Sequence, residues 1–594
     1  MHLSLPLLLV VSAGLVPALA CAQGAATSGA ATRPVRLVDR IEAPMLYLSL
    51  EADPAKSGES AGPVHRLLAD PAFDSLLGKE GNSAPRDSAG RALALVRGVL
   101  ARSAGDVELA LTGVVPNGGQ PLLVLRARLQ RNEAGRMSEL LAGPDLAAPQ
   151  RRLGETQTYS LREADGVSRD EIGGRVELAV VGDDLIVAND GTAMQELLAP
   201  APEVTSATPI RRVLSADPRF NQLKAQLAAG PGSLMLYGDW QRLSRRLQAS
   251  SEGVPQAVLS WSGLDNARTV MAALAGDDAD FTGTLLLDFE VPAGGGRGSQ
   301  FDGWFAAAES VPARSLLSTL PPGGLGGIVM AVDLAQIAQR SPRGARMLHE
   351  LGHAFDDFGL DFERKVLGRL GTGGTVQLLF READGAPEIV SVYSLRAKSK
   401  QAASALFADL RRSVESHGSG KLLPARGRNG AEVLELHHRH GMRRRDDGRE
   451  GGGRDGGGRD EPGPPGPGPG PGPGRERPED VPVFVAVFED TVLLGADADT
   501  MNVVLDEYRR SARTRGKRDA AVNKAVAAIG GDKVAGLFDV DLRPLFERIT
   551  NQLVSRDGAA AIDLSRIPQR HTGYLDVQPR ADGAVLRIRV LSAR

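Results

Sequence analysis

The feature that most constrains this chain is an internal repeat. The stretch Glu177–Leu198 recurs without a gap as Phe484–Leu505, and Asp183 of the first copy is matched by Asp490 of the second. Each copy has two short apolar runs separated by a tight polar turn, followed by apolar residues at helical spacing. This pattern predicts a strand, a turn, a strand and a helix. Its recurrence so far along the chain indicates that a larger unit is duplicated.

A second, partial sequence repeat supports the duplication. The residues of Lys224–Gly230 recur in part in Lys524–Gly530, at nearly the same separation. Asp239 and Asp539 also correspond, and we expect both to be N-caps that follow a strand. The sequence therefore predicts an α+β fold of two tandem repeats, each an antiparallel sheet covered by helices. The first unit is expected to span 36–299 and the second 300–594.

Periodicity predicts further elements within each unit. The expected helices lie at 64–77, 88–101, 131–141, 219–229, within 344–370, and at 402–414. The expected strands lie at 45–50, 107–111, 122–129, 157–162, 232–239, 282–291, 328–333, 376–380, 388–395, 432–436 and 584–591. The second unit differs by a Gly/Pro/Arg-rich insertion at 441–481, which we expect to be a disordered surface loop because its Pro-Gly period of two is not that of collagen.

The N-terminus has the features of a secretory signal. An apolar run from Leu3 to Leu19 precedes small residues, which predicts a signal peptide over 1–22 and a flexible segment over 23–35. Cys21 is the only cysteine, which excludes disulfides. In the alternative to a cleaved signal, Cys21 is lipidated and anchors the protein to a membrane. No later stretch is apolar enough to span a bilayer, so we expect a secreted or periplasmic protein of a bacterial envelope.

The charge balance and the aromatic content of the chain argue against some classes of binding partner. Lys and Arg number 70 against 73 Asp and Glu, so no global field attracts nucleic acid. Aromatic residues make up 4% of the chain, which argues against a stacking platform for sugars or single strands. We therefore expect an envelope partner that the sequence does not identify.

One short motif could carry chemistry. His349-Glu350-Leu351-Gly352-His353 resembles the HExxH signature of zincin metalloproteases. On a helix, residues four apart share a face, so His349 and His353 could bind zinc while Glu350 acts as general base. The site needs a third protein ligand, and Asp357, one turn after His353, is the nearby candidate. In the first unit, Arg66 and Ala69 occupy the positions that correspond to Glu350 and His353. The first copy of the helix therefore lacks the motif, and the alternative interpretation is a solvated or partly packed amphipathic helix without a metal.

Other candidates have simpler explanations. His437, His438 and His440 lie at the edge of the insertion and could bind a metal adventitiously. The glycine-rich segment at 322–327 precedes a strand, and the one at 416–421 lacks the spacing of a phosphate-binding loop.

The order of elements also resembles a known group of proteins. A helix that ends in Gly359-Leu360-Asp361, and a Gly182–Asp190 strand that leads into a helix, are similar to extracytoplasmic bacterial proteins with a domain of unknown function. This resemblance implies no activity and no cofactor. The favoured hypothesis is a non-enzymatic envelope protein with a binding or structural role. The alternatives are a zinc-dependent metallopeptidase that uses residues 349–353, and a cradle for an apolar ligand.

Overall fold

The computed structural model describes most of both expected units. The described residues are 36–41, 44–50, 103–114, 121–143, 147–161, 176–189, 191–199, 213–227, 233–242, 266–276, 280–290, 308–321, 325–340, 342–356, 360–383, 386–417, 420–423, 432–436, 483–495, 497–511, 515–544, 547, 569–580 and 583–593. The expected signal peptide, Cys21, the helices at 64–77 and 88–101, and the insertion at 441–481 lie outside them. No helix among these residues is long and apolar enough to cross a membrane.

The chain divides into two compact units. The smaller unit contains residues 347–371 and 392–509. The larger unit contains residues 2–346, 372–391 and 510–594. The predicted boundary between residues 299 and 300 separates the two copies of the sequence repeat. The two compact units are defined by the contacts within each unit, so they are a different division of the chain.

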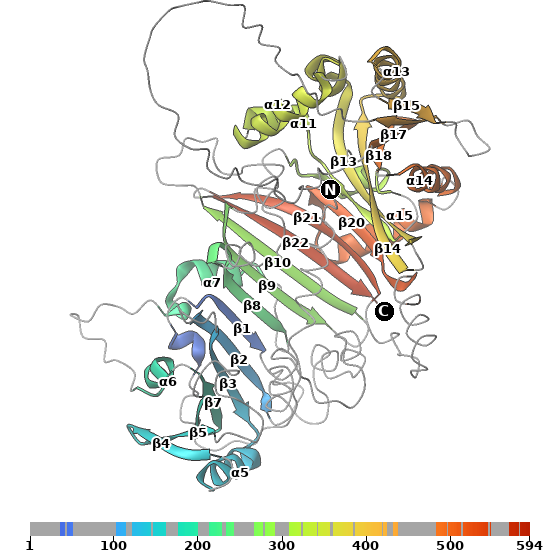
Figure 1. Ribbon diagram of the computed structural model, residues 1–594. Coiled ribbons are helices and arrows are strands. Elements are labelled where there is room, and N and C mark those ends of the chain that lie inside the picture. The colour runs from blue at the N-terminus through green and yellow to red at the C-terminus, as the bar shows by residue number, and fades with distance from the viewer. Residues whose placement is uncertain are drawn as a thin grey trace, which may run out of the picture. The chain divides into compact units, whose positions relative to one another are not determined.

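The larger unit is built on an extended antiparallel sheet (Figure 1). Following the hydrogen-bonded neighbours, the strand order is β4-β5-β6-β7-β3-β2-β1-β8-β9-β10-β22-β21-β20-β12-β13. The strands are β1 (Leu46–Leu50), β2 (Ser103–Val114), β3 (Pro121–Leu129), β4 (Ala147–Leu153), β5 (Thr156–Leu161), β6 (Glu177–Val181), β7 (Asp184–Ala188), β8 (Leu234–Asp239), β9 (Ala267–Gly276), β10 (Asp280–Glu290), β12 (Gly326–Met330), β13 (Leu370–Ala383), β20 (Gly536–Asp541), β21 (Arg570–Arg580) and β22 (Gly583–Ala593). A separate pair joins β11 (Val311–Pro312) to β19 (Lys533–Val534).

The C-terminal strand β22 joins distant parts of the chain. It pairs with β21 on one side and with β10 on the other, where the register runs from Asp280 opposite Ala593 to Glu290 opposite Gly583. Residues 280–290 and the last strand of the chain therefore form one continuous hydrogen-bond ladder.

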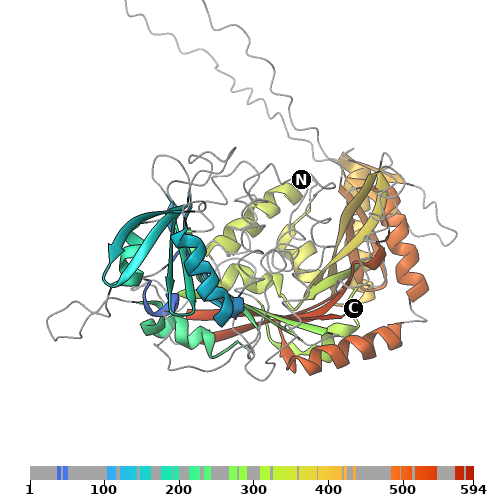
Figure 2. The same cartoon turned by 90° about the horizontal axis from the view of Figure 1, so that it is seen from below.

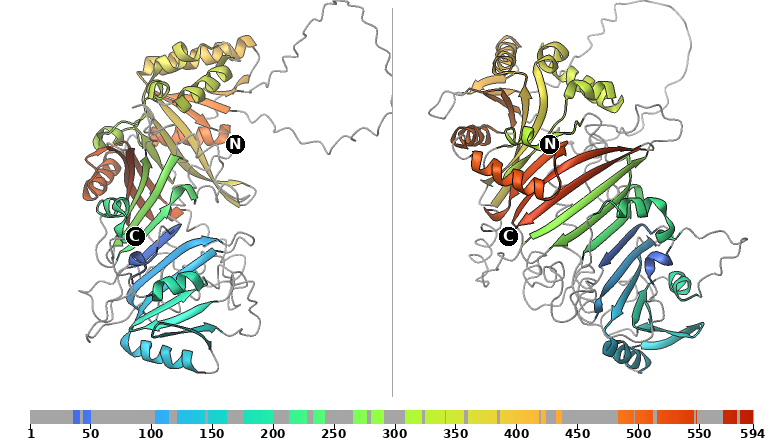
Figure 3. Two further views of the ribbon diagram at one scale, coloured as in Figure 1. Left: turned by 90° about the vertical axis from the view of Figure 1, so that its left-hand side faces the viewer. Right: turned by 180° about the vertical axis from the view of Figure 1, so that it is seen from behind.

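Helices pack against both faces of this sheet. The helical elements of the larger unit are η1 (Leu37–Asp39), α5 (Arg131–Ala142), α6 (Gly191–Leu198), η3 (Leu214–Ala216), α7 (Pro218–Lys224), α10 (Ala313–Leu317), α11 (Leu334–Arg340) and α15 (Arg515–Ala528). Phe220 of α7 lies in a core cluster with Val585, while Val526 of α15 lies in one that Leu591 packs against. Val585 and Leu591 point to the same side of β22 because alternate residues of a strand share a face. Both helices therefore cover the same face (Figures 2 and 3).

The smaller unit repeats the combination of strands and helices. Its strand order is β15-β16-β17-β18-β14, all antiparallel. The elements are α12 (Pro342–Asp356), η6 (Phe362–Val366), η7 (Leu367–Arg369), β14 (Ala386–Ala397), α13 (Lys400–His417), β15 (Gly420–Leu423), β16 (Val433–Leu436), β17 (Val483–Phe488), β18 (Thr491–Gly495) and α14 (Ala498–Ser511). Asp497 caps α14, because its carboxylate accepts hydrogen bonds from the backbone and hydroxyl of Thr500, each at 2.7 Å.

The predicted mixture of helices and antiparallel strands is confirmed. Both copies of the repeated hairpin form the strand, turn, strand and helix that the pattern predicts, as β6-β7-α6 and β17-β18-α14. The prediction that Asp539 is an N-cap is wrong. Asp539 lies within β20, and its carboxylate accepts hydrogen bonds from Arg570 and Thr572 on β21. The capping role falls to Asp541, which accepts from the backbone of Arg543 at 3.0 Å.

Candidate functional site

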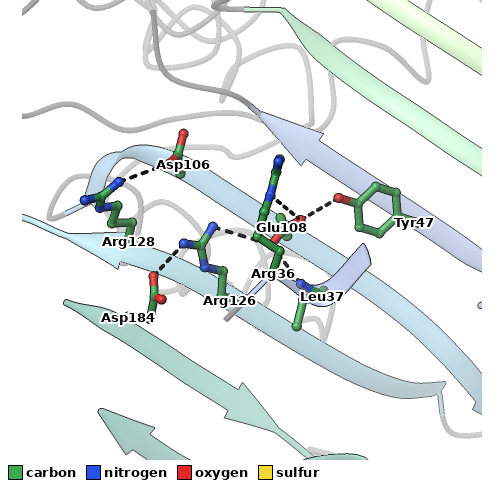
Figure 4. A network of polar contacts seen from close by, with 8 residues as sticks. All are labelled: Arg36, Leu37, Tyr47, Asp106, Glu108, Arg126, Arg128 and Asp184. Carbon is green, nitrogen blue, oxygen red and sulfur yellow. Dashed lines mark hydrogen bonds and ion pairs between the residues drawn. The ribbon is translucent and has the colours of Figure 1, made fainter. Parts of the chain in front are cut away.

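The best-defined polar cluster lies inside the sheet of the larger unit (Figure 4). At its centre, the Arg126 side chain on β3 is only 2% exposed. Its Nη2 atom donates to Asp184 Oδ1 on β7 at 2.6 Å, and its Nη1 atom donates to Glu108 Oε2 on β2 at 3.4 Å. One cation is therefore held between two buried carboxylates.

Glu108 links this ion pair to the first strand. Its Oε1 atom accepts a hydrogen bond from the Tyr47 hydroxyl at 2.6 Å, and its Oε2 atom accepts one from the backbone N–H of Leu37 at 3.0 Å. Arg36, whose side chain is 41% exposed, approaches the carboxylate at 3.9 Å. Burial, and then the charge and hydrogen bond of Glu108, raise the pKa of the Tyr47 phenol far above its ordinary value, so Tyr47 is a permanent donor.

Strand register brings these side chains together. Arg126 lies opposite Glu108 in the β2–β3 ladder and opposite Ile186 in the β3–β7 ladder. Asp184 is two residues from Ile186 on β7 and shares its face, within diagonal reach of a long side chain. Ala110 and Ile186 on this face are fully buried, so the charged cluster replaces part of an apolar core.

The arrangement is suited to holding strands together. Both Glu108 oxygens and the Asp184 carboxylate accept hydrogen bonds from donors on neighbouring elements, which is the condition under which buried charge is tolerated. Arg126 Nε has no hydrogen-bond partner within the described part of the chain. The cluster spans β1, β2, β3 and β7, and its chemistry is that of a structural ion network.

An aromatic cluster lies beside it under α7. The Phe220 ring packs edge-on against Tyr47 at 6.3 Å and against Tyr237 at 5.1 Å between centroids. Burial, followed by the negative charge of Asp217, raises the pKa of Tyr237 to about 12. Arg219 of α7 forms an ion pair with Asp288, whose side chain is fully buried on β10. These contacts fix α7 against β1, β8 and β10.

The HExxH residues lie on α12. Within the smaller unit, Leu348 is buried, and Phe355 stacks on Phe362 of η6 at 5.1 Å. This packing turns His349 and His353 to the surface, where both side chains are exposed. Their Nε2 atoms lie 3.1 Å apart, with ring centroids 4.4 Å apart. The side chain of Glu350 and the whole of Asp357 lie outside the described residues.

The geometry meets part of the requirement for zinc. Two nitrogen ligands at 2.0–2.1 Å from a tetrahedral zinc ion lie roughly 3.3 Å apart, close to the observed Nε2 separation. Within the described ranges, however, no three His, Cys, Asp or Glu side chains are grouped so that they could hold a metal ion. The two histidines are brought together as the motif predicts, and the hydrolytic site stays a prediction without a placed third ligand.

Sequence reasoning missed the buried network. Its signal is present, since Glu108 stands in the apolar strand VELAL and Arg126 in LLVLRARL. A charged residue within a run of apolar strand residues is buried only with a partner. Two such residues of opposite sign on expected neighbouring strands would have predicted the pair.

The chain was compared with family models, curated proteins and solved structures. No family model and no curated protein matches the chain. Among solved structures, "Structure of crystal form IV of TP0453" has 11% sequence identity and a TM-score of 0.23, and the match covers 42% of this chain and 79% of that chain. "Structure of crystal form III of TP0453" has 10% identity and a TM-score of 0.23, with 44% and 81% covered. TM-scores this low carry no argument about fold or function, so the resemblance to a domain of unknown function stays a prediction.

Proposed function

We propose that this chain is a non-enzymatic protein of the bacterial cell envelope, secreted or periplasmic. In this proposal, two tandem copies of one α+β unit form a scaffold that has a structural role or binds an envelope partner. The observation that carries the proposal is the buried Glu108–Arg126–Asp184 network, because its carboxylates and the two guanidinium Nη atoms are engaged in joining strands.

Matching strand pairings support the tandem copies. Each of six neighbour pairs in the first half has a counterpart in the second: β6–β7 and β17–β18, β3–β7 and β14–β18, β1–β2 and β12–β13, β1–β8 and β12–β20, β8–β9 and β20–β21, β9–β10 and β21–β22. Corresponding side chains also share environments, since Met194 and Met501 are both fully buried. A duplicated unit explains why the same pairing order recurs in two stretches of different sequence.

Fractionation of bacterial cells tests the proposal. The full chain with a C-terminal epitope should be found in the periplasm, the envelope membranes or the medium, whereas a variant that lacks residues 1–22 should stay in the cytoplasm. A Cys21→Ser variant distinguishes the two forms of export, because it releases a lipid-anchored protein from membranes and leaves a cleaved, free protein unchanged. Recovery of the full chain in the cytoplasm would refute the envelope location.

The metallopeptidase alternative has one observation in its favour, the 3.1 Å separation of the two histidine Nε2 atoms. In this alternative, His349 and His353 bind zinc and Glu350 is the general base. Peptide hydrolysis that a zinc chelator abolishes, and that Glu350→Gln removes without loss of folding, would replace the non-enzymatic proposal.

The cradle alternative is favoured by an apolar cluster on the face of the sheet opposite α7 and α15. Leu286 and Val585 face α7, so Leu285 and Leu586 point to the opposite face, where a second apolar cluster includes partly buried Leu575 and Val577. Saturable binding of a fatty acid that a Leu575→Asp variant loses would support a cradle on this face.

A further inference from the structure

We infer that His349 and His353 form a surface site for a divalent transition-metal ion, held by two imidazoles and completed by water. The inference goes beyond the proposed envelope function and does not require hydrolysis. It assigns a metal-binding role to α12, a helix for which the non-enzymatic hypothesis specifies no role.

The helix is held so that the two rings converge. Gly352 lies between the histidines in sequence and faces η6, where a Cβ atom at this position would meet the Phe362 ring at 3.7 Å. Together with the stacked Phe355 and Phe362 rings, this contact fixes the rotation of α12 about its axis. His349 and His353 therefore share an exposed face, one helical turn apart.

The ring geometry fits a shared cation. The two rings are tilted by 68° and their Nε2 atoms face each other at 3.1 Å. A metal ion that binds both atoms needs a separation of roughly 3.3 Å, so an adjustment of a few tenths of an ångström within staggered rotamers is sufficient. A hydrogen bond between two neutral imidazoles is the competing arrangement, and on an exposed surface it contributes little.

The ligand set defines which ions are expected. Imidazole nitrogen suits zinc, copper and nickel, and affinity for such ions generally increases from nickel to copper and is lower again for zinc. Carboxylate-preferring ions such as calcium and magnesium are not expected to bind. A site with two protein ligands keeps open positions, which water fills.

Metal titration of the mature, tag-free chain tests the site. Isothermal calorimetry with zinc chloride, and separately with copper and nickel salts, should show one strong site, and calcium should show none. His349→Ala and His353→Ala should each weaken binding at least tenfold. Metal-free thermal unfolding of each variant, followed by circular dichroism, checks that weaker binding does not come from loss of folding. A chain with His437, His438 and His440 all replaced by alanine is the matched control and should retain the site.

Each outcome decides the inference. Unchanged affinity in His353→Ala, or loss of binding in the triple variant, would refute it. Glu350→Gln separates metal binding from catalysis. Zinc binding with no peptide hydrolysis supports both the site and the non-enzymatic proposal. Zinc-dependent hydrolysis that Glu350→Gln abolishes while metal affinity is retained would leave the site standing and overturn the proposed function.

Discussion

Replacement of Arg126 by methionine should destabilise the larger unit strongly. The substitution retains much of the side-chain length and removes the charge, so Glu108 and Asp184 lose the cation that lies between them. Removing one partner of a buried ion pair costs about 3–5 kcal/mol, because the other charges stay buried without the cation that neutralised them. At a urea dependence of about 3 kcal/mol/M, the upper end for small proteins, this cost corresponds to a midpoint shift of roughly 1–1.7 M, and the steeper dependence of a larger unit makes the shift smaller.

The neighbouring Arg128 provides the matched control. It lies on the same strand, and its contact with Asp106 is 3.9 Å long between side chains that are 41% and 33% exposed. Exposed pairs of this kind contribute about 0–1 kcal/mol, so Arg128→Met should leave the midpoint almost unchanged. Urea unfolding followed by circular dichroism compares the two variants, and two transitions are to be fitted separately if both units unfold independently. Equal midpoint shifts in the two variants would refute the reasoning.

Three further predictions follow from individual side chains. Glu489→Gly should stabilise the protein by about 1 kcal/mol in thermal unfolding, because Glu489 has a positive φ of 53° where the corresponding Gly182 has 61°; a lower melting temperature would contradict it. Tyr237 favours the neutral phenol in the folded state, so its contribution to stability should be complete below pH 10 and lost as the pH rises toward about 12; a Tyr237→Phe variant that shows the same alkaline stability profile would contradict this. Burial lowers the pKa of His571 despite the opposing charge of Asp541, so its contribution should be present above a pH of about 6.5 and lost as the pH falls through the lowered pKa; His571→Gln should flatten this part of the pH–stability curve, and an unchanged curve would argue against it.

The sequence predicted elements whose own pattern is strong. The hairpins at 177–198 and 484–505 combine apolar runs with a two-residue turn, and they form as expected. Strands β4, β9, β15 and β21 were not predicted. The β9 sequence ARTVMAALAG is rich in alanine, and the β21 sequence RHTGYLDVQPR is polar with a glycine and a proline. Their strand conformation depends on pairing with neighbours, which lies outside any local window.

The histidine pair and the buried ion network also differ in how far the sequence predicts them. The convergence of His349 and His353 depends only on helical spacing, so the sequence predicts it. The partnership of Glu108, Arg126 and Asp184 depends on the register of three strands, which local sequence does not specify. The misassigned role of Asp539 has the same origin, because Arg570 and Thr572 come from a strand that was not predicted.

The pairing of β10 with β22 has a consequence for folding during synthesis. Strand β10 is complete long before residues 583–593 leave the ribosome, so its outer edge lacks its native neighbour until the chain is finished. An unpaired strand edge can recruit other chains, and contacts between residues so distant in sequence form slowly. Early termination before Gly583 would make this unpaired state permanent, with both β10 and β21 left as open edges.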